Sequence, residues 1–155
     1  MSRERPGPLA RIEPELAYKG HPIWDEIRPR PEIGRPGGFG PSEFRNPYMM
    51  DVHFLRLLYR MRQAAGVPFR IQSDYRSPEH NETVGGAENS AHTETPCRAV
   101  DLWAASNYER FRIITTASRF GFNRIGTSKY GADPQTGAGL IHLDASERLP
   151  AEVMW

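Results

Sequence analysis

The sequence predicts an α+β fold, with a small antiparallel sheet and helices that flank it. Two segments, 51–66 and 106–121, have the periodicity of amphipathic helices, and several shorter segments have the pattern of strands. The helices do not alternate strictly with the strands, so a parallel βα repeat is not expected. The expected strands cover residues 68–76, 98–104, 123–129 and 139–145. A chain of 155 residues is long enough for one domain with one hydrophobic core.

The first 45 residues differ from the rest in their proline content. Eight of the 14 prolines lie within the first 41 positions, and proline is excluded from helix interiors and central strands. We therefore expect residues 1–45 to form an extended N-terminal arm that lies across a body formed by residues 46–155. The residues expected to anchor the arm are Ile23, Trp24 and Phe39.

The first helix is expected over residues 51–66. Asp51 stands near its start, and Gly66 follows its last periodic residue, with Pro68 just beyond. Steps of three and four residues separate the apolar positions, which places them on one helix face. These positions are Phe54, Leu55, Leu58, Met61 and Ala65.

A strand over residues 68–76 is expected next, because apolar and polar residues alternate there before a polar turn. Ser77 and Pro78 then predict one short helical turn, with the serine as cap and the proline at the first helical position. The pair Gly85 and Gly86 opens a loop.

The second helix is expected over residues 106–121. Ser106 and Glu109 have the spacing of a capping box, and Gly121 ends the segment. Its apolar stripe is expected to consist of Phe111, Ile114, Ala117 and Phe120. After this helix, the strands 123–129 and 139–145 are joined by a loop rich in Gly, Pro and Asp.

Two expected strands carry charged or ionisable side chains in apolar surroundings. Asp101 lies between Val100 and Leu102, and a buried carboxylate must be partnered. In the strand 139–145, side chains alternate between faces. Ile141 and Leu143 are therefore expected to face the core, and the opposite face is expected to carry Leu140, His142 and Asp144.

His92, Asp101 and His142 together make a candidate metal site. Two nitrogens and one oxygen are the three protein ligands of a catalytic zinc site, which leaves the fourth position to water. The same set also describes the facial triad of non-haem iron oxygenases, in which His142 and Asp144 would form the compact pair. An ion pair at Asp101 is the simpler alternative. The other histidines are expected at the surface or in packing contacts: His21, His53 and His80.

Four segments of the sequence resemble the zinc D-alanyl-D-alanine carboxypeptidase family, which shares its fold with the Hedgehog signalling domain. They are "SDYRSPEHNETVGGAENSAH", "AVDL", "RFGFNRIG" and "IHLD", and the resemblance runs from about residue 44 to residue 145. It implies a Hedgehog/DD-peptidase-like fold, with residues 46–155 as the catalytic domain. It also implies that His92, Asp101 and His142 bind one zinc ion. Arg76 then matches an arginine that binds a substrate carboxylate or the oxyanion, and Ser90 matches a serine at the substrate site.

The sequence departs from the family pattern between the first two ligands. The family usually places the aspartate seven residues after the first histidine, whereas here Asp101 follows His92 by nine. The extra residues fall in "TETPC", which can bulge outward as a polar loop. This loop also brings Glu94 and Cys97 near the site as substitute ligands, although we expect Cys97 to be a small buried residue.

A second departure concerns the general base. Many relatives place an acidic residue or a histidine two or three positions before the last ligand, where this chain has Leu140 and Gly139. Asp144 is the best remaining candidate because it shares a strand face with His142. Its alternative role is to orient the histidine ligand, and Glu94 and Asp133 are weaker candidates for the base.

The predicted function is that of a zinc metallopeptidase that hydrolyses amide bonds in short peptides, as a carboxypeptidase or an endopeptidase. Family members act mostly on peptidoglycan stem peptides, and many come from bacteria or their phages. A non-catalytic zinc domain that binds peptidoglycan or has a structural role is the alternative, and the iron oxygenase is less favoured.

Composition limits the partners and the compartment. A formal net charge of +1 predicts no nucleic-acid partner, and no apolar run reaches the length of about 20 residues that a membrane span needs. One cysteine allows no internal disulfide. No secretory segment is visible at the start. We therefore expect synthesis in the cytoplasm, with release by lysis or transport in a phage particle.

Overall fold

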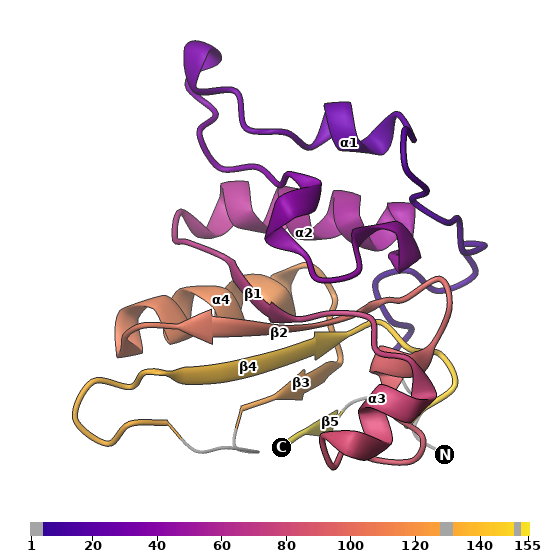
Figure 1. Ribbon diagram of the computed structural model, residues 1–155. Coiled ribbons are helices and arrows are strands. Elements are labelled where there is room, and N and C mark those ends of the chain that lie inside the picture. Colours follow the sequence, from indigo (N-terminus) through magenta and orange to yellow (C-terminus); the bar gives the residue numbers. More distant parts are fainter. Residues whose placement is uncertain (1–4, 128–131, 151–152) are drawn as a thin grey trace.

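The computed structural model describes residues 5–127, 132–150 and 153–155 (Figure 1). Its architecture is α+β, as predicted. The described strands form a single sheet in the order β1-β2-β4-β3-β5. The first four are antiparallel to their neighbours, and β5 is parallel to β3. The strands are β1 (Arg70–Ser73), β2 (Ala99–Ala104), β3 (Arg124–Gly126), β4 (Gly139–Asp144) and β5 (Val153–Met154).

The two long helices cover one face of the sheet. They are α2 (Val52–Ala65) and α4 (Asn107–Arg119), which contact each other, and α4 also contacts β2 and β4. In Figure 1, α2 lies between the sheet and the N-terminal segment that contains α1 (Ile23–Glu26). The short helix α3 (Pro78–Thr83) lies apart from them, next to the 3₁₀ turn Ala91–Thr93.

Local signals explain the ends of α2 and α3. The Asp51 carboxylate accepts a hydrogen bond from the Phe54 N–H, and Gly66 ends α2 in the left-handed conformation with φ = 67°. Ser77 caps α3 by accepting from the His80 N–H. Both helices are confirmed as predicted. Each cap residue is close in the sequence to the helix end that it caps, so the sequence alone indicates that end.

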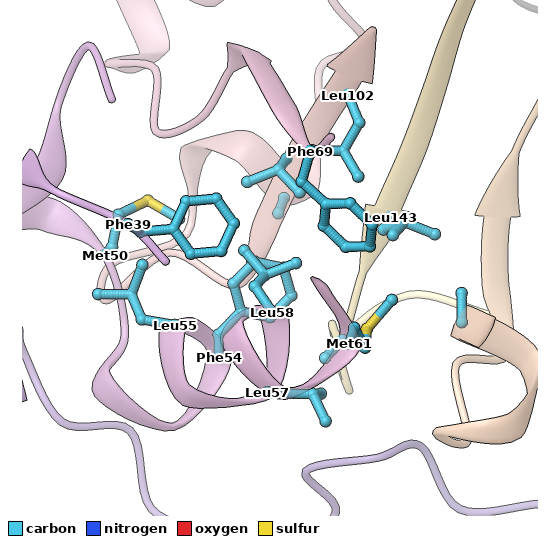
Figure 2. Packing of buried hydrophobic residues seen from close by; sticks show 14 of the residues in the cluster. Phe39, Met50, Phe54, Leu55, Leu57, Leu58, Met61, Phe69, Leu102 and Leu143 are labelled. Carbon is cyan, nitrogen blue, oxygen red and sulfur yellow. The ribbon is translucent and has the colours of Figure 1, made fainter. Parts of the chain in front are cut away.

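Side chains from α2 and the sheet meet in the hydrophobic core (Figure 2). Phe54, Leu58 and Met61 of α2 are fully buried, as are Leu102 of β2 and Leu143 of β4. Burial of each such side chain contributes about 1.5–3 kcal/mol. The core therefore fixes the sheet face on which α2 and α4 pack, and leaves the opposite face for other chemistry.

The N-terminal segment contributes to this same core. Ile23 and Phe39 are fully buried and Trp24 is nearly so, as expected for anchors. A buried ion pair adds a second attachment, because Arg98 Nε lies 3.0 Å from Asp51 Oδ2 and its Nη2 donates to the Ile12 carbonyl at 2.8 Å. Loss of one partner of such a pair leaves an uncompensated buried charge.

The predicted apolar stripe of α4 is wrong at its first position. Phe111 is 63 % exposed, whereas Ile113 and Ala117 are fully buried. Two overlapping stripes with steps of three and four residues exist on this helix, and the sequence alone does not rank them. The Arg112 guanidinium donates to the Ala65 carbonyl at the end of α2. In the structure, α4 buries Ile113 and turns Phe111 outward.

The strands β1 and β3 are shorter than predicted, and β5 was not predicted. β1 ends at Ser73 because the Asp74 carboxylate turns away to accept from the backbone N–H groups of Arg45 and Asn46. The described part of the 123–129 segment forms β3 (Arg124–Gly126), and residues 128–131 lie outside the described residues. β5 was not predicted, because two residues carry no readable periodicity.

Candidate metal centre

The strand register places two of the three candidate ligands, Asp101 and His142, in one row across the sheet. Asp101 of β2 is directly opposite His142 of β4, and Ser73 of β1 and Gly126 of β3 extend the row on either side. Directly paired side chains on one face of an antiparallel sheet are in contact. Asp101 and His142, which are 41 residues apart in the sequence, are thereby brought together.

The expected alternation of faces is observed in both strands. Val100 and Leu102 flank Asp101 and are fully buried in the core, as are Ile141 and Leu143 beside His142. The two ligand side chains point to the opposite face and remain partly accessible, with 12 % and 17 % exposed. The core therefore fixes the direction of both ligand side chains.

His92 reaches the site from the 3₁₀ turn Ala91–Thr93. Ser90 caps this turn by accepting from the His92 N–H at 3.2 Å. His92 Nδ1 lies 2.7 Å from the Asp74 carbonyl oxygen, which can only accept, so Nδ1 carries the proton. The lone pair of a neutral His92 is then on Nε2, which faces the cluster.

The three residues fit a metal ion. One candidate ligand atom from each of His92, Asp101 and His142 lies within 4.8 Å of the other two. His92 Nε2 is buried 3.3 Å from Asp101 Oδ2, yet it has no hydrogen-bond partner within the described part of the chain. A buried ring nitrogen without a partner is costly unless another ligand satisfies it. A bound cation is such a ligand, and this is the donor set of a zinc site with an open position.

Electrostatics at the cluster favour the ionised carboxylate. Burial raises the pKa of Asp101, but the hydrogen bond from His142 and the nearby His92 ring outweigh it, so the pKa lies below its usual value. Burial lowers the pKa of His142, but the bonds to Asp101 and Asp144 outweigh it, so that pKa is raised.

Asp144 lies behind His142, and both of its oxygens are engaged. It is fully buried, and Oδ2 is 2.6 Å from His142 Nε2 while Oδ1 is 2.6 Å from Arg124 Nε. Burial raises its pKa, but His142 and Arg124 outweigh that effect and lower it. With Nε2 bound to Asp144, His142 directs Nδ1 toward Asp101, at 2.9 Å from Oδ1. This geometry favours an orienting role for Asp144 over that of a free base.

Arg76 stands at the edge of the cluster. Its guanidinium contacts Asp101 Oδ2 at 3.3 Å, rather than the carboxylate of Asp74 or Glu79, which are its neighbours in the sequence. Ser73 Oγ and Asn81 Oδ1 accept its other N–H groups at 3.2 and 3.1 Å. The Arg76 backbone N–H also donates to the His92 carbonyl. One residue thus joins β1, α3 and the turn that carries His92.

The weaker candidates for ligand or base lie elsewhere. Glu94 accepts from Ser146 Oγ and Arg148 Nε, at 2.6 and 3.0 Å. Asp133 accepts from N–H groups of its own loop. Cys97 is a fully buried free thiol, as expected, and burial raises its pKa. None of the three belongs to the described metal cluster.

The other histidines also lie apart from this centre. His21 and His53 both face Glu15, with nitrogen–oxygen distances of 2.9 and 3.8 Å. His80 is an exposed residue of α3. They occupy surface and packing positions, as predicted.

The cluster forms one side of a pocket of about 380 Å³, a size within the range of small-ligand sites. Arg76 and Ser90 line it together with the ligands. Arg124 and Trp155 also line it, and the sequence analysis did not select them. Alternation along β3 gives a signal for Arg124, which lies two residues before Gly126. Trp155 follows the unpredicted strand β5 and gives no comparable signal.

The fold and the ligand set define a class, an α+β protein whose three candidate ligands leave a metal coordination position open inside a pocket. Residues 32–133 match a family model described as Peptidase M15. The chain belongs to the Peptidase M15 family, the family of zinc D-Ala-D-Ala carboxypeptidase-like peptidases, which confirms the resemblance. The matched segment includes His92 and Asp101 and ends before His142. A search of curated proteins gave no match.

Family membership and the cluster together support a peptidase with a metal site. They favour this class over the iron oxygenase. In addition, the oxygenase interpretation requires both His142 and Asp144 as ligands, but Asp144 does not belong to the described metal cluster. Among the described helices, none has the length and apolar character needed to cross a bilayer.

Proposed function

We propose that this protein is a zinc-dependent peptidase that hydrolyses amide bonds in short peptides, with peptidoglycan stem peptides as its substrates. The observation that carries the proposal is the convergence of His92, Asp101 and His142 on a pocket of an M15 family member. His92 Nε2 has no hydrogen-bond partner among the described residues. Access to peptidoglycan would follow lysis or transport in a phage particle.

His92, Asp101 and His142 would hold the ion. Zinc supplies a Lewis acid and a bound water whose pKa is lowered toward about 7. His92 is kept in the required tautomer by the Asp74 carbonyl, and His142 by Asp144. Such outer partners orient the ligands and raise their basicity.

Arg76 would bind the substrate. Its guanidinium is held by Ser73 and Asn81 and lines the pocket beside Asp101. A fixed guanidinium can donate two parallel hydrogen bonds to a substrate carboxylate, or it can stabilise negative charge on a carbonyl oxygen. Ser90 would contribute a second polar group at the pocket wall, although its hydroxyl already caps the turn that carries His92.

A proton acceptor is also required, and Asp144 is the candidate that the sequence analysis favoured. To act in this way it would have to exchange its contact with His142 or Arg124 for one with the substrate side of the pocket. Substitution of Asp144 separates the two roles, as set out in the Discussion.

A second candidate function is a zinc-containing module that binds peptidoglycan peptides without cleaving them. One observation favours it. Within the described residues, the carboxylates that line the pocket are Asp101 and Asp144, and both are fully engaged with neighbouring side chains. This candidate predicts zinc and peptide binding but no products, even with excess protein over long incubations.

Digestion of purified peptidoglycan with and without a chelator tests the proposal, with the products identified by mass spectrometry. We expect released peptides from the zinc-loaded protein, no products after chelation, and recovery when zinc is restored. His92→Ala should lose both zinc and activity.

His80→Ala is the matched control, because His80 is an exposed histidine of α3 outside the cluster. It should retain both zinc and activity. Cleavage that persists in the chelated protein, or in His92→Ala, would contradict the proposed mechanism. Zinc binding without any products would select the binding module.

A further inference from the structure

Trp155 stands beside the candidate metal ligand His142. The centroids of the two rings are 5.4 Å apart, with an angle of 43° between the ring planes. The His142 ring also lies 5.0 Å from the His92 ring. All three rings line the same pocket, and Trp155 is 38 % exposed there.

The backbone holds this indole in place. The Trp155 N–H donates to the Ile125 carbonyl at 3.0 Å, and the Trp155 carbonyl accepts from the backbone N–H and the hydroxyl of Thr127. These bonds continue the pairing of β5 with β3 by one residue. The sheet thus fixes the backbone from which the indole projects.

Side-chain packing also restricts the indole. A Cβ atom on Gly126 would lie 2.9 Å from the indole and 3.0 Å from His142 Cβ, so glycine gives the indole room to approach the ligand row. The Arg124 guanidinium lies over the indole, 5.3 Å from its centroid, and also bonds Asp144 and the Pro150 carbonyl. The indole is therefore a preorganised surface.

We infer that Trp155 is a specificity-determining residue, which contacts the substrate and limits the size of the side chain seated beside His142. Two observations support this inference. The indole occupies space directly next to a ligand of the reacting centre, and its contacts on two sides prevent it from moving away without breaking the stack with Arg124. A substrate residue with a methyl group fits beside the ring, whereas a larger side chain meets it.

This inference rests on the proposed peptidase function. It is tested with acetylated tripeptides in which one position at a time is changed from alanine to leucine and to phenylalanine. Two readouts are recorded with the zinc-loaded protein. One is kcat/KM for each peptide, and the other is calorimetric binding of copies in which the scissile amide is reduced to a methylene-amine, so that binding is measured without turnover.

We expect wild type to discriminate against phenylalanine by about tenfold or more at one position, in kcat/KM and in binding. Trp155→Ala should reduce this discrimination to below about threefold by improving the large peptide, with little change for the alanine peptide. Trp155→Phe should give an intermediate value. Trp103→Ala is the control, since Trp103 is equally exposed on the same sheet face but does not line this pocket.

Discrimination that is unchanged in Trp155→Ala, or equal losses for small and large peptides, would overturn the inference while leaving the peptidase intact. A wild-type protein that neither binds nor cleaves any of the peptides would overturn the proposed function, and the inference with it. Thermal unfolding is recorded for every variant. If Trp155→Ala is not folded, Trp155→Leu takes its place with the same expected direction.

Discussion

The two faces of β2 and β4 place different demands on their side chains. On one face, Leu102 and Leu143 fill space against α2 and α4, and their contribution depends on volume and apolar area. On the other face, Asp101 and His142 contribute single atoms at defined distances. Successive residues alternate between these roles, so one register error would move the site into the core.

The comparison separates stability from chemistry within the same strands. A core position tolerates a similar shape, because packing is shared among many neighbours. At the proposed metal site, a ligand position would tolerate no substitute that lacks the right lone pair, because the ion would depend on three protein atoms. We therefore expect substitutions on the two faces to affect different measurements, and the following predictions are ordered by the size of the effect.

The largest effect on the core face is expected for Leu102→Ala. Removal of this fully buried side chain should lower the free energy of unfolding by about 2–5 kcal/mol. The zinc affinity of the molecules that remain folded should not change, because the adjacent Asp101 points to the other face. Urea unfolding and a zinc titration below the unfolding range measure the two quantities. A parallel loss of zinc affinity would mean that the faces are not independent.

Asp144→Asn tests the link behind His142. If Asp144 orients the ligand, loss of its charge should weaken zinc binding by about 10–100-fold, with activity restored at saturating zinc. If Asp144 is instead the base, zinc affinity should be kept and kcat should remain low at any zinc concentration. Competition with a chromophoric chelator and kcat at saturating zinc distinguish these outcomes. Glu94→Gln, which changes a carboxylate outside the cluster, is the control.

The pH dependence should have opposite signs with and without zinc. The raised pKa of His142 means that its protonated form stabilises the metal-free protein below the ordinary value of about 6.5, and that this contribution is lost as the pH rises through the raised pKa. Zinc needs the unprotonated ring, so its affinity should fall about tenfold for each pH unit below that pKa. Thermal unfolding across pH 5–9, with and without zinc, checks both signs. Parallel slopes would exclude His142 as a ligand.

The smallest effect is expected for Phe111→Ala. Because this side chain is 63 % exposed, its loss should change the free energy of unfolding by no more than about 0.5 kcal/mol. Ile113→Ala, two residues further along α4, should cost about 2–5 kcal/mol. Chemical denaturation of both variants measures the difference. Equal costs would contradict the rotation of α4 described above.

The predictable parts of the fold are those that local chemistry specifies. α2 begins and ends where Asp51 and Gly66 place it, and the alternation in β4 assigns Ile141 to the core and His142 to the other face. The stripe predicted for α4 is wrong at Phe111, because two apolar stripes overlap on this helix. Local pattern does not decide between such stripes, whereas the burial of Ile113 in the core shows which one packs inward.

The candidate site was predictable in its composition but not in its geometry. Residue types and family resemblance selected His92, Asp101 and His142. The proximity of Asp101 and His142 depends on the pairing of β2 with β4, which the sequence does not specify. The same holds for the contact of Asp144 with Arg124 and for the approach of Trp155, which depends on a two-residue strand. These contacts are long-range. Alternation along β3 indicates the face on which Arg124 lies, but no local pattern indicates that it meets Asp144.

The most direct test of the central claim is anomalous diffraction at the zinc absorption edge, from crystals of the zinc-loaded protein. We predict one peak bonded to His92 Nε2, an Asp101 carboxylate oxygen and His142 Nδ1, and no peak at this place in crystals of His92→Ala. A zinc peak bound elsewhere, with these three side chains unligated, would contradict the account.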